Sequence, residues 1–313
     1  MPVKALVITG PTASGKTSVS IELAHRFGGE IISADSMQIY KYMDIGTAKP
    51  DETEREGIPH HMLDVAYPWE EYSVAQYAEE ARRCIRETAQ RGRLPIIAGG
   101  TGLYINALVE NIRYGASADL DPGEIAELER FAQERGADAL HAVLQKEDPE
   151  AAAQIHCNNV KRVVRAVGMK RKTGMTLAER NRASKSADPE IECTVYAVET
   201  ARDVLYEKID HRVDAMIRAG LAEEVRHVIK ICKNAYNHGE TQQESLGRTA
   251  LQAIGYKEMI CCFNGEYDFE TAVERIKQGT RNYAKRQITW FRKPAWVNWI
   301  GLEDLRCIKR PEG

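Results

Sequence analysis

Residues 10–17 match the pattern G-x-x-x-x-G-K-T, with which many proteins bind phosphate groups. An apolar, β-prone run at 5–9 precedes this segment, and residues 18–27 after it have the pattern of an amphipathic helix. In such a strand–turn–helix, free backbone amides and the positive end of the helix dipole bind phosphate oxygens. We therefore predict an anion-binding loop that consists of Gly10, Pro11, Thr12, Ala13, Ser14, Gly15, Lys16 and Thr17.

Two side chains of this loop suit the same chemistry. Lys16 adds a positive charge, and the Thr17 hydroxyl is a predicted ligand for Mg²⁺. The alternative is an ordinary glycine-rich turn that contains a lysine. That alternative does not account for the strand before the loop and the helix after it, so we favour phosphate binding.

The composition is that of an ordinary soluble globular protein, with 43% hydrophobic and 28% charged residues in 313. The net charge of −3 means that a nucleic-acid partner must be met by local basic patches. No stretch approaches the length of a membrane span, and the first strand begins without a signal peptide. The seven cysteines form no C-x-x-C pair. We expect a cytoplasmic monomer with reduced thiols and no membrane contact.

Strand and helix patterns alternate through the first 115 residues. A helix is predicted from Ser73, which can cap it, to about Gly92, and a short helix follows Thr101. Such alternation predicts an α/β fold with a parallel sheet flanked by helices. Ligands of such sheets bind at the carboxyl ends of the strands. The predicted strands after the first lie at 30–35, 61–65 and 94–98, and one shared site is expected at 9–10, Asp35 and 99–101.

The pattern changes after about residue 115. Residues 116–190 lack strand signals and read as an all-helical insertion, with helix starts at 121–122 and 148–149. The core domain is therefore predicted in two parts: residues 1–115, which contain the P-loop, and residues 191–313. In this last part we predict a strand at 191–198, helices at 202–233 broken at Gly220, and a long helix at 269–292.

Two groups of basic residues indicate RNA binding. The second group is interleaved with Tyr283, Trp290 and Phe291, which suits phosphate contact together with base stacking. A solvated helix face is the alternative for either group alone. The first group comprises Lys161, Arg162, Arg165, Lys170, Arg171 and Lys172, and the second Arg281, Lys285, Arg286, Arg292 and Lys293.

The P-loop alone leaves the class of protein open. A nucleotide or nucleoside kinase is one possibility, although the strand at 94–98 ends in two glycines where an NTPase has a magnesium-binding acid. Asp64 is a possible substitute for that acid. A non-catalytic RNA-binding adaptor is another possibility. His60 and His61 have no third ligand at a metal-binding spacing, so we expect a loop or core role for them.

A wider set of motifs resembles the bacterial tRNA dimethylallyltransferases, or isopentenyltransferases. These motifs lie, in order along nearly the whole chain, at 10–17, 32–40, 43–50, 99–104, 252–257 and 285–292. The resemblance implies transfer of a dimethylallyl group from its diphosphate to the exocyclic amine of the adenosine 3′ to the anticodon. It also implies a requirement for Mg²⁺, release of diphosphate, and a P-loop that holds the prenyl diphosphate.

The resemblance implies roles for particular residues. Asp35 matches the general base, which the weakly nucleophilic adenine amine needs, and Arg202 matches an arginine that faces the diphosphate. Lys16 and Thr101 complete the expected catalytic set. Lys208 stands where better-known members have a second arginine. The insertion would grip the anticodon stem-loop, and the implied tRNA contacts are Asp35, Ser36, Met37, Gln38, Thr101, Lys161, Arg162, Val163, Val164, Arg165, Gln252, Ala253, Ile254, Gly255, Tyr256, Lys257, Lys285, Arg286, Gln287, Ile288, Thr289, Trp290, Phe291 and Arg292.

Overall fold

A computed structural model describes residues 2–114, 120–184, 189–235, 247 and 249–311. The chain forms two compact units, which are described separately. The first unit comprises Met1–Val109 together with Glu190–Gly313, and the second comprises Glu110–Pro189. The second unit overlaps the helical insertion expected at 116–190.

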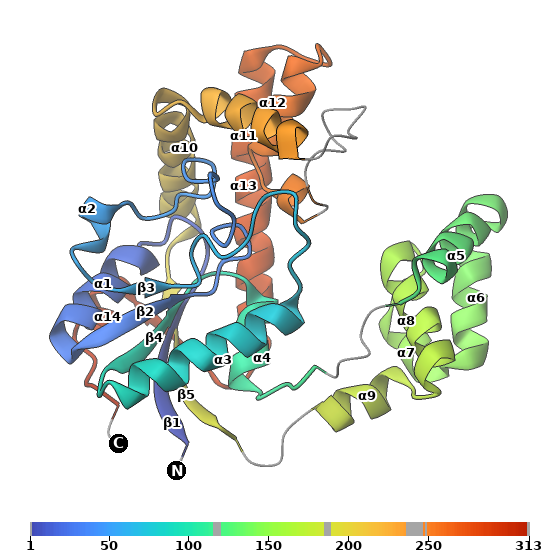
Figure 1. The fold of residues 1–313 in the computed structure, drawn as a ribbon, viewed down its shortest axis with the longest axis horizontal. Coiled ribbons are helices and arrows are strands. Elements are labelled where there is room, and N and C mark those ends of the chain that lie inside the picture. Colours follow the sequence, from blue (N-terminus) through green and yellow to red (C-terminus); the bar gives the residue numbers. More distant parts are fainter. Residues whose placement is uncertain (1, 115–119, 185–188, 236–246, 248, 312–313) are drawn as a thin grey trace. The chain divides into compact units, whose positions relative to one another are not determined.

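The first unit is built on a single six-stranded sheet in the order β3-β2-β4-β1-β5-β6 (Figure 1). Every pair of neighbouring strands is parallel, as the alternating pattern predicted. β1 lies in the interior of the sheet, with Leu6 opposite Ile96 on one side and Thr194 on the other. The strands are β1 Val3–Thr9, β2 Gly29–Ser33, β3 His60–His61, β4 Leu94–Ala98, β5 Ile191–Glu199 and β6 Val297–Gly301.

Alternate residues of the strands face opposite layers of helices. Leu6 and Ile8 of β1 pack with Val19 and Leu23 of α1 in one apolar cluster. Val7 of β1 belongs to the cluster on the other face, which contains residues of α3, α4, α11, α12 and α13. A parallel sheet covered on both faces explains why its strands are continuous apolar runs.

The long helices of the first unit lie where the sequence predicted them. The Ser73 hydroxyl accepts from the Gln76 amide and caps α3, and Gly220 separates α10 from α11, so both predictions are confirmed. The helices are α1 Lys16–Phe27, α2 Glu52–Arg55, α3 Val74–Gln90, α4 Gly102–Val109, α10 Arg202–Arg218, α11 Leu221–Ala235, α12 Tyr256–Phe263, α13 Phe269–Phe291 and α14 Leu302–Arg306, with a 3₁₀ turn at Ala250–Gln252.

In the second unit, all of the secondary-structure elements of the described residues are helices. Asp121 and Asp148 cap α5 and α7, each with a proline at the next position, so the two predicted helix starts are confirmed. Leu140, Leu144 and Val167 are fully buried in a core of its own. The helices are α5 Pro122–Arg135, α6 Ala137–Glu147, α7 Pro149–Gln154, α8 Val160–Thr173 and α9 Leu177–Ser184.

Two parts of the sheet differ from the prediction. The strand expected at 61–65 lies at His60–His61, because Met62 (φ 62°) and Asp64 (φ 56°) have left-handed backbone angles that end an extended strand. The edge strand β6 and helix α14 were not predicted. β6 is short, and among the described strands it pairs only with β5, from about 100 residues earlier in the chain, so local pattern does not reveal it.

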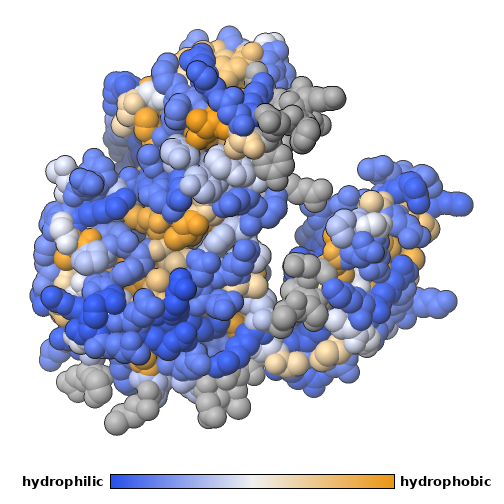
Figure 2. Space-filling view, viewed as in Figure 1, coloured by the Kyte–Doolittle hydropathy of each residue, from blue (hydrophilic) through white to orange (hydrophobic). Residues whose placement is uncertain are grey.

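Polar residues cover most of the face in Figure 2, and apolar residues appear in small groups between them. Among the described helices, none has both the length and the apolar character that a membrane crossing requires.

Candidate active site

The carboxyl ends of three neighbouring strands are joined by hydrogen bonds. The Thr9 hydroxyl, at the end of β1, donates to the Gly99 carbonyl at 2.9 Å, just beyond β4. Beyond β2, the Ala34 amide donates to the Ala98 carbonyl at 2.8 Å, and its carbonyl accepts from the Thr101 amide at 3.0 Å. The predicted positions 9–10, Asp35 and 99–101 therefore meet at one edge of the sheet.

The loop at 10–17 has the backbone of a phosphate-binding turn. Gly15 (φ 88°) has a left-handed conformation and immediately precedes α1, so the loop's amides lie at the helix N-terminus. A Cβ atom at Gly10 would lie 3.1 Å from the Val198 amide nitrogen, so the close packing on β5 favours glycine. The buried Ser14 hydroxyl has no hydrogen-bond partner among the described residues.

A pocket lies between this loop and the ends of β2 and β4. Thr12, Lys16 and Thr17 line it from the loop, and Asp35 lines it from beyond β2. Arg212 of α10 lines it as well. The remaining lining residues are Ser20, Ile31, Ser33, Gln38, Thr47, Pro50, His60, Ala98 and Gly99. The pocket thus combines two cations, a carboxylate and hydroxyl groups within one chain.

The electrostatics of Lys16 follow from this setting. The pKa of Lys16 is lowered to about 8, mainly by burial and also by the positive charge of Arg212, whereas Asp35 acts in the opposite direction. Lys16 Nζ donates to the Pro11 carbonyl at 3.1 Å. Two cations that repel each other in a buried pocket are stabilised by a bound anion, so the pocket suits a multiply charged phosphate ligand.

Arg212 lines this pocket, and Arg202, which the sequence motifs assign to the diphosphate, does not. Arg212 Nη1 donates to the Thr12 hydroxyl at 3.3 Å, and its guanidinium lines the pocket. Arg202 and Lys208 lie on the same helix but are exposed, and the Arg202 guanidinium lies 5.1 Å from the centre of the Tyr206 ring. The sequence does hold a signal for Arg212, because it falls on the helix face of the buried Leu205 and Ile209.

Asp35 is held by the backbone that follows it. Its Oδ1 accepts from the Met37 amide at 2.9 Å, which turns the chain directly beyond β2. The Thr101 hydroxyl accepts from the Ser36 amide at 2.9 Å and donates to the Ser36 hydroxyl at 3.3 Å. Thr101 therefore fixes the backbone beside Asp35. Because the Met37 amide bonds to Oδ1, the other carboxylate oxygen of Asp35 is left for the pocket.

The side chains expected to contact tRNA divide by exposure. The buried ones lie on the inner faces of α8, α12 and α13 or in the turn at 253–255, and they are Val163, Val164, Ala253, Gly255, Tyr256, Gln287 and Phe291. In this structure these residues lie in the interior, where Gln287 and Tyr256 also form hydrogen bonds. The exposed ones are Lys161, Arg162, Arg165, Gln252, Lys257, Lys285, Arg286, Thr289, Trp290 and Arg292, and the rest are partly buried.

The two basic groups are partly neutralised. Arg171 forms an ion pair with Glu147 at 2.8 Å, and Arg281 forms one with Asp210 at 2.6 Å. Arg286 lies over the Tyr283 ring, with its guanidinium 5.8 Å from the ring centre. The exposed basic residues, rather than the whole groups, are the candidates for contact with phosphate.

The two histidines and Asp64 have structural partners. His61 Nε2 contacts Glu30 Oε2 at 2.7 Å, and His60 Nδ1 contacts the Ile58 carbonyl at 2.8 Å. Asp64, considered as a magnesium-binding acid, pairs with Lys49 at 2.6 Å and does not line the pocket. In the part of the chain that the structure describes, no three His, Cys, Asp or Glu side chains come together as a metal site.

A doubly covered parallel sheet with a glycine-rich loop after its first strand defines a P-loop α/β protein, and the cationic pocket defines a phosphate-binding site. The model of the family described as IPP transferase matches residues 38–294. The chain belongs to this family.

Curated relatives match the chain over nearly its full length. One, named tRNA dimethylallyltransferase, from Caldanaerobacter subterraneus subsp. tengcongensis, is 43% identical over 99% of this chain and 95% of its own. Another of that name, from Acetivibrio thermocellus, is 46% identical over 96% of this chain and 92% of its own. The resemblance seen in the sequence motifs is thereby confirmed.

Solved structures of transferases that act on tRNA are also similar to this chain. The full-length tRNA isopentenylpyrophosphate transferase from Bacillus halodurans is 39% identical, with a TM-score of 0.68 over 97% of this chain and 93% of its own. A eukaryotic dimethylallyltransferase, whose structures are described as snapshots of the enzyme acting on tRNA, is 32% identical. Its TM-score is 0.77 over 92% of this chain and 69% of its own.

Proposed function

We propose that the protein transfers a dimethylallyl group from dimethylallyl diphosphate to the exocyclic amine of the adenosine 3′ to the anticodon in tRNA. The observation that supports this most is the pocket itself, in which Lys16 and Arg212 lie on the same lining as Asp35. The first two suit a diphosphate, and the third suits a proton acceptor. The names of the full-length relatives point to the same reaction.

In the proposed step one bond forms and another breaks. The amine nitrogen of adenine bonds to the first carbon of the dimethylallyl group, while the bond from that carbon to the diphosphate oxygen breaks. The proton of the amine passes to Asp35, which acts as general base. The bond electrons leave with the diphosphate, whose growing negative charge Lys16 and Arg212 stabilise.

Mg²⁺ fits this site through a small number of protein ligands. The Thr17 hydroxyl lines the pocket and would hold the ion, together with oxygens of the diphosphate. Magnesium sites on phosphate substrates often use one or two protein groups and several phosphate or water oxygens. When bound, the ion supplies neutralisation of the diphosphate charge.

For the tRNA we infer contact through exposed basic residues of both units. Lys161, Arg162 and Arg165 of α8 would meet phosphates of the anticodon stem-loop, and Lys285 and Arg286 of α13 would do so near the pocket. The pocket uses residues of one chain, so a monomer is sufficient. We place the protein in the cytoplasm with its tRNA substrate.

Mass spectrometry of tRNA tests the proposal. Unmodified tRNA is incubated with the protein, Mg²⁺ and dimethylallyl diphosphate, then digested to nucleosides. We expect one adenosine to gain a dimethylallyl group, and no gain with the donor omitted. A nucleotide kinase, which transfers phosphate from ATP to a nucleotide, would leave the mass of tRNA unchanged here, and an RNA-binding adaptor would bind tRNA without changing its mass. Either result would contradict the proposal.

A further inference from the structure

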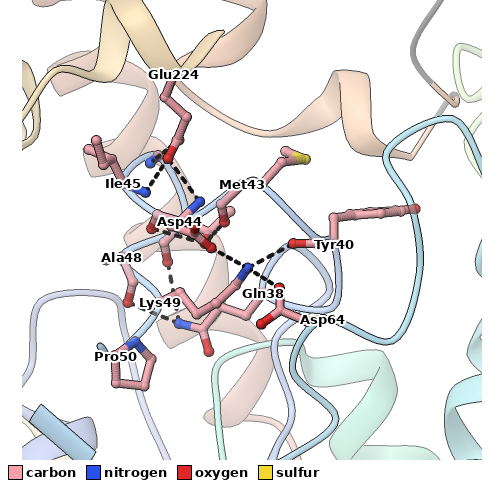
Figure 3. Close-up of polar contacts among 12 residues, drawn as sticks. Gln38, Tyr40, Met43, Asp44, Ile45, Ala48, Lys49, Pro50, Asp64 and Glu224 are labelled. Atoms are coloured by element: carbon pink, nitrogen blue, oxygen red, sulfur yellow. Dashed lines mark hydrogen bonds and ion pairs between the residues drawn. The ribbon is translucent and has the colours of Figure 1, made fainter. Parts of the chain in front are cut away.

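The motif at 43–50 has no role in the proposed reaction, yet one carboxylate from a distant helix holds it. Glu224, near the start of α11, accepts hydrogen bonds from the amides of Asp44 at 3.0 Å, Ile45 at 2.6 Å and Gly46 at 2.9 Å (Figure 3). Its Oε1 also accepts from the Tyr256 hydroxyl at 2.6 Å. Hydrogen bonds to a charged acceptor are the stronger kind, so this is a firm attachment.

A buried cation holds the same segment from within. The Lys49 side chain is 3% exposed, and its Nζ lies 2.6 Å from Asp44 Oδ1 and 2.6 Å from Asp64 Oδ1. Nζ also donates to the Tyr40 carbonyl at 2.8 Å. Figure 3 shows these acceptors arranged around the ammonium group. Each of its three protons has an acceptor, as a buried ammonium requires.

The backbone of this segment is strained and closely packed. Ala48 (φ 48°) and Tyr42 (φ 67°), which directly precedes the segment, have left-handed conformations that are unfavourable for residues with a side chain. A Cβ atom at Gly46 would lie 2.5 Å from Tyr256 Cε2, so only glycine lets the segment reach Glu224. Such conformations persist where the surroundings enforce them.

The segment is also tied to the pocket. Gln38 Nε2 donates to the carbonyls of Thr47 at 3.3 Å and Ala48 at 3.1 Å. Its Oε1 accepts from the Ser33 hydroxyl, on the last residue of β2, at 3.1 Å. Gln38, Thr47 and Pro50 all line the pocket, and Gln38 lies three residues after Asp35. A continuous set of hydrogen bonds therefore links Glu224 to the pocket wall beside Asp35.

We infer that Glu224 is a positioning residue for the transfer reaction: it holds residues 44–50 as a fixed wall of the donor pocket. This inference rests on the proposed function. It also gives the motif at 252–257 a role, because Tyr256 supplies a hydrogen bond to Glu224 and shapes the space for Gly46. Neither Glu224 nor Tyr256 lines the pocket.

The chain offers a closely matched control. Glu224→Gln removes the charge and replaces one of the two accepting oxygens with an NH₂ group, which cannot accept from the donors that it faces. Glu223→Gln removes the same charge one residue earlier, at an exposed carboxylate whose partner is Arg226 at 3.5 Å. Both positions lie in the first turn of α11, so both changes have a similar effect on the helix dipole. Tyr256→Phe removes one hydrogen bond without adding a donor.

Two measurements test the inference. Hydrogen exchange reports the amides of Asp44, Ile45 and Gly46, and steady-state transfer gives kcat/KM for the donor and KM for tRNA separately. For Glu224→Gln we expect those amides to exchange on the order of tenfold faster or more. We expect the donor kcat/KM to fall about 10- to 100-fold, with the KM for tRNA unchanged. Tyr256→Phe should show a smaller change of the same kind, and Glu223→Gln none.

Three results would overturn the inference. One is unchanged protection of the amides in Glu224→Gln. Another is faster exchange with an unchanged donor kcat/KM. The third is an equal effect of Glu223→Gln. If the unaltered protein does not modify tRNA, the proposed reaction is wrong, but exchange and calorimetric affinity for dimethylallyl diphosphate still decide whether Glu224 fixes the pocket wall. In that case unchanged affinity in Glu224→Gln would contradict it.

Discussion

The side-chain oxygen of Gln287 accepts a hydrogen bond from the amide of Thr12 at 2.8 Å, although the two residues are 275 positions apart. Gln287 Nε2 donates to the Gly100 carbonyl at 2.9 Å. The side chain is buried, and a Cβ atom at Gly100 would lie 2.1 Å from this nitrogen. One glutamine of α13 thus holds the phosphate-binding loop beside the end of β4.

We expect Gln287→Leu to weaken donor binding and lower stability. Leucine has a similar size but leaves the Thr12 amide and the Gly100 carbonyl unpaired, at a cost of about 1–3 kcal/mol. Chemical denaturation and calorimetric titration with dimethylallyl diphosphate measure the two effects. The exposed Gln278 of the same helix provides the control, Gln278→Leu. Equal results for the two variants would contradict the tethering role.

Donor binding should depend on the protonation of Lys16. Its pKa is lowered to about 8, chiefly by burial, so above this value the ligand-free pocket loses a positive charge. We expect the donor Kd to rise with pH, by up to tenfold per pH unit above about pH 8. The Lys16→Met variant should bind the donor weakly, with an affinity that does not change with pH in this range. Calorimetric titration between about pH 7.5 and 9.5 measures this.

The same pKa predicts an opposite trend in stability. Between about 8 and the ordinary lysine pKa of 10.5, unfolded Lys16 binds more protons than folded Lys16. This group's contribution to the free energy of unfolding therefore rises with pH in that window. A donor affinity that stayed constant across the window, with the expected stability trend present, would remove Lys16 from diphosphate binding.

Arg212, rather than Arg202, should carry the arginine contribution to catalysis. Arg212 lines the pocket and bonds to Thr12, whereas Arg202 is exposed on the same helix. Removing a charge that stabilises the leaving group costs on the order of 10²-fold in rate. We expect that loss in single-turnover transfer by Arg212→Ala, and a much smaller one for Arg202→Ala. A larger loss for Arg202→Ala would favour the assignment that the sequence motifs imply.

Exposed arginines should contribute to tRNA binding by pairing with phosphates. Arg286→Ala and Arg165→Ala each remove one such pairing, which should reduce the slope of log affinity against log salt by about one unit or slightly less. Filter binding across a salt series measures this slope. Arg281→Ala is the control on α13, because Asp210 already neutralises Arg281. An unchanged slope for Arg286→Ala would exclude its pairing with phosphate.

Local signals predicted much of the fold. The loop at 10–17, the Ser73 cap and the aspartate–proline helix starts act within a few residues, so their structures follow from the sequence nearby. The long helix predicted to Arg292 ends at Phe291. The bounds of β3 were predicted incorrectly and β6 was not predicted, because short edge strands depend on partners elsewhere in the chain.

The pocket required tertiary information. Arg212 faces Thr12 only because α10 packs beside the phosphate-binding loop, and nothing in the spacing of the two residues indicates this. Gln287 and Tyr256 belong to motifs interpreted as tRNA contacts, yet both are buried and hold loops of the pocket. A sequence motif thus does not distinguish residues that contact a ligand from residues that hold the ligand site in place.

Single-turnover transfer by Asp35→Asn, across a magnesium titration, tests the general-base role of Asp35 most directly. Asparagine keeps the size of the side chain and can still accept a hydrogen bond, but it cannot take the proton. We predict normal binding of donor and tRNA and a rate about 10²- to 10⁴-fold lower, which added Mg²⁺ does not restore. Weakened donor binding with recovery at high Mg²⁺ would contradict this and make Asp35 a metal ligand.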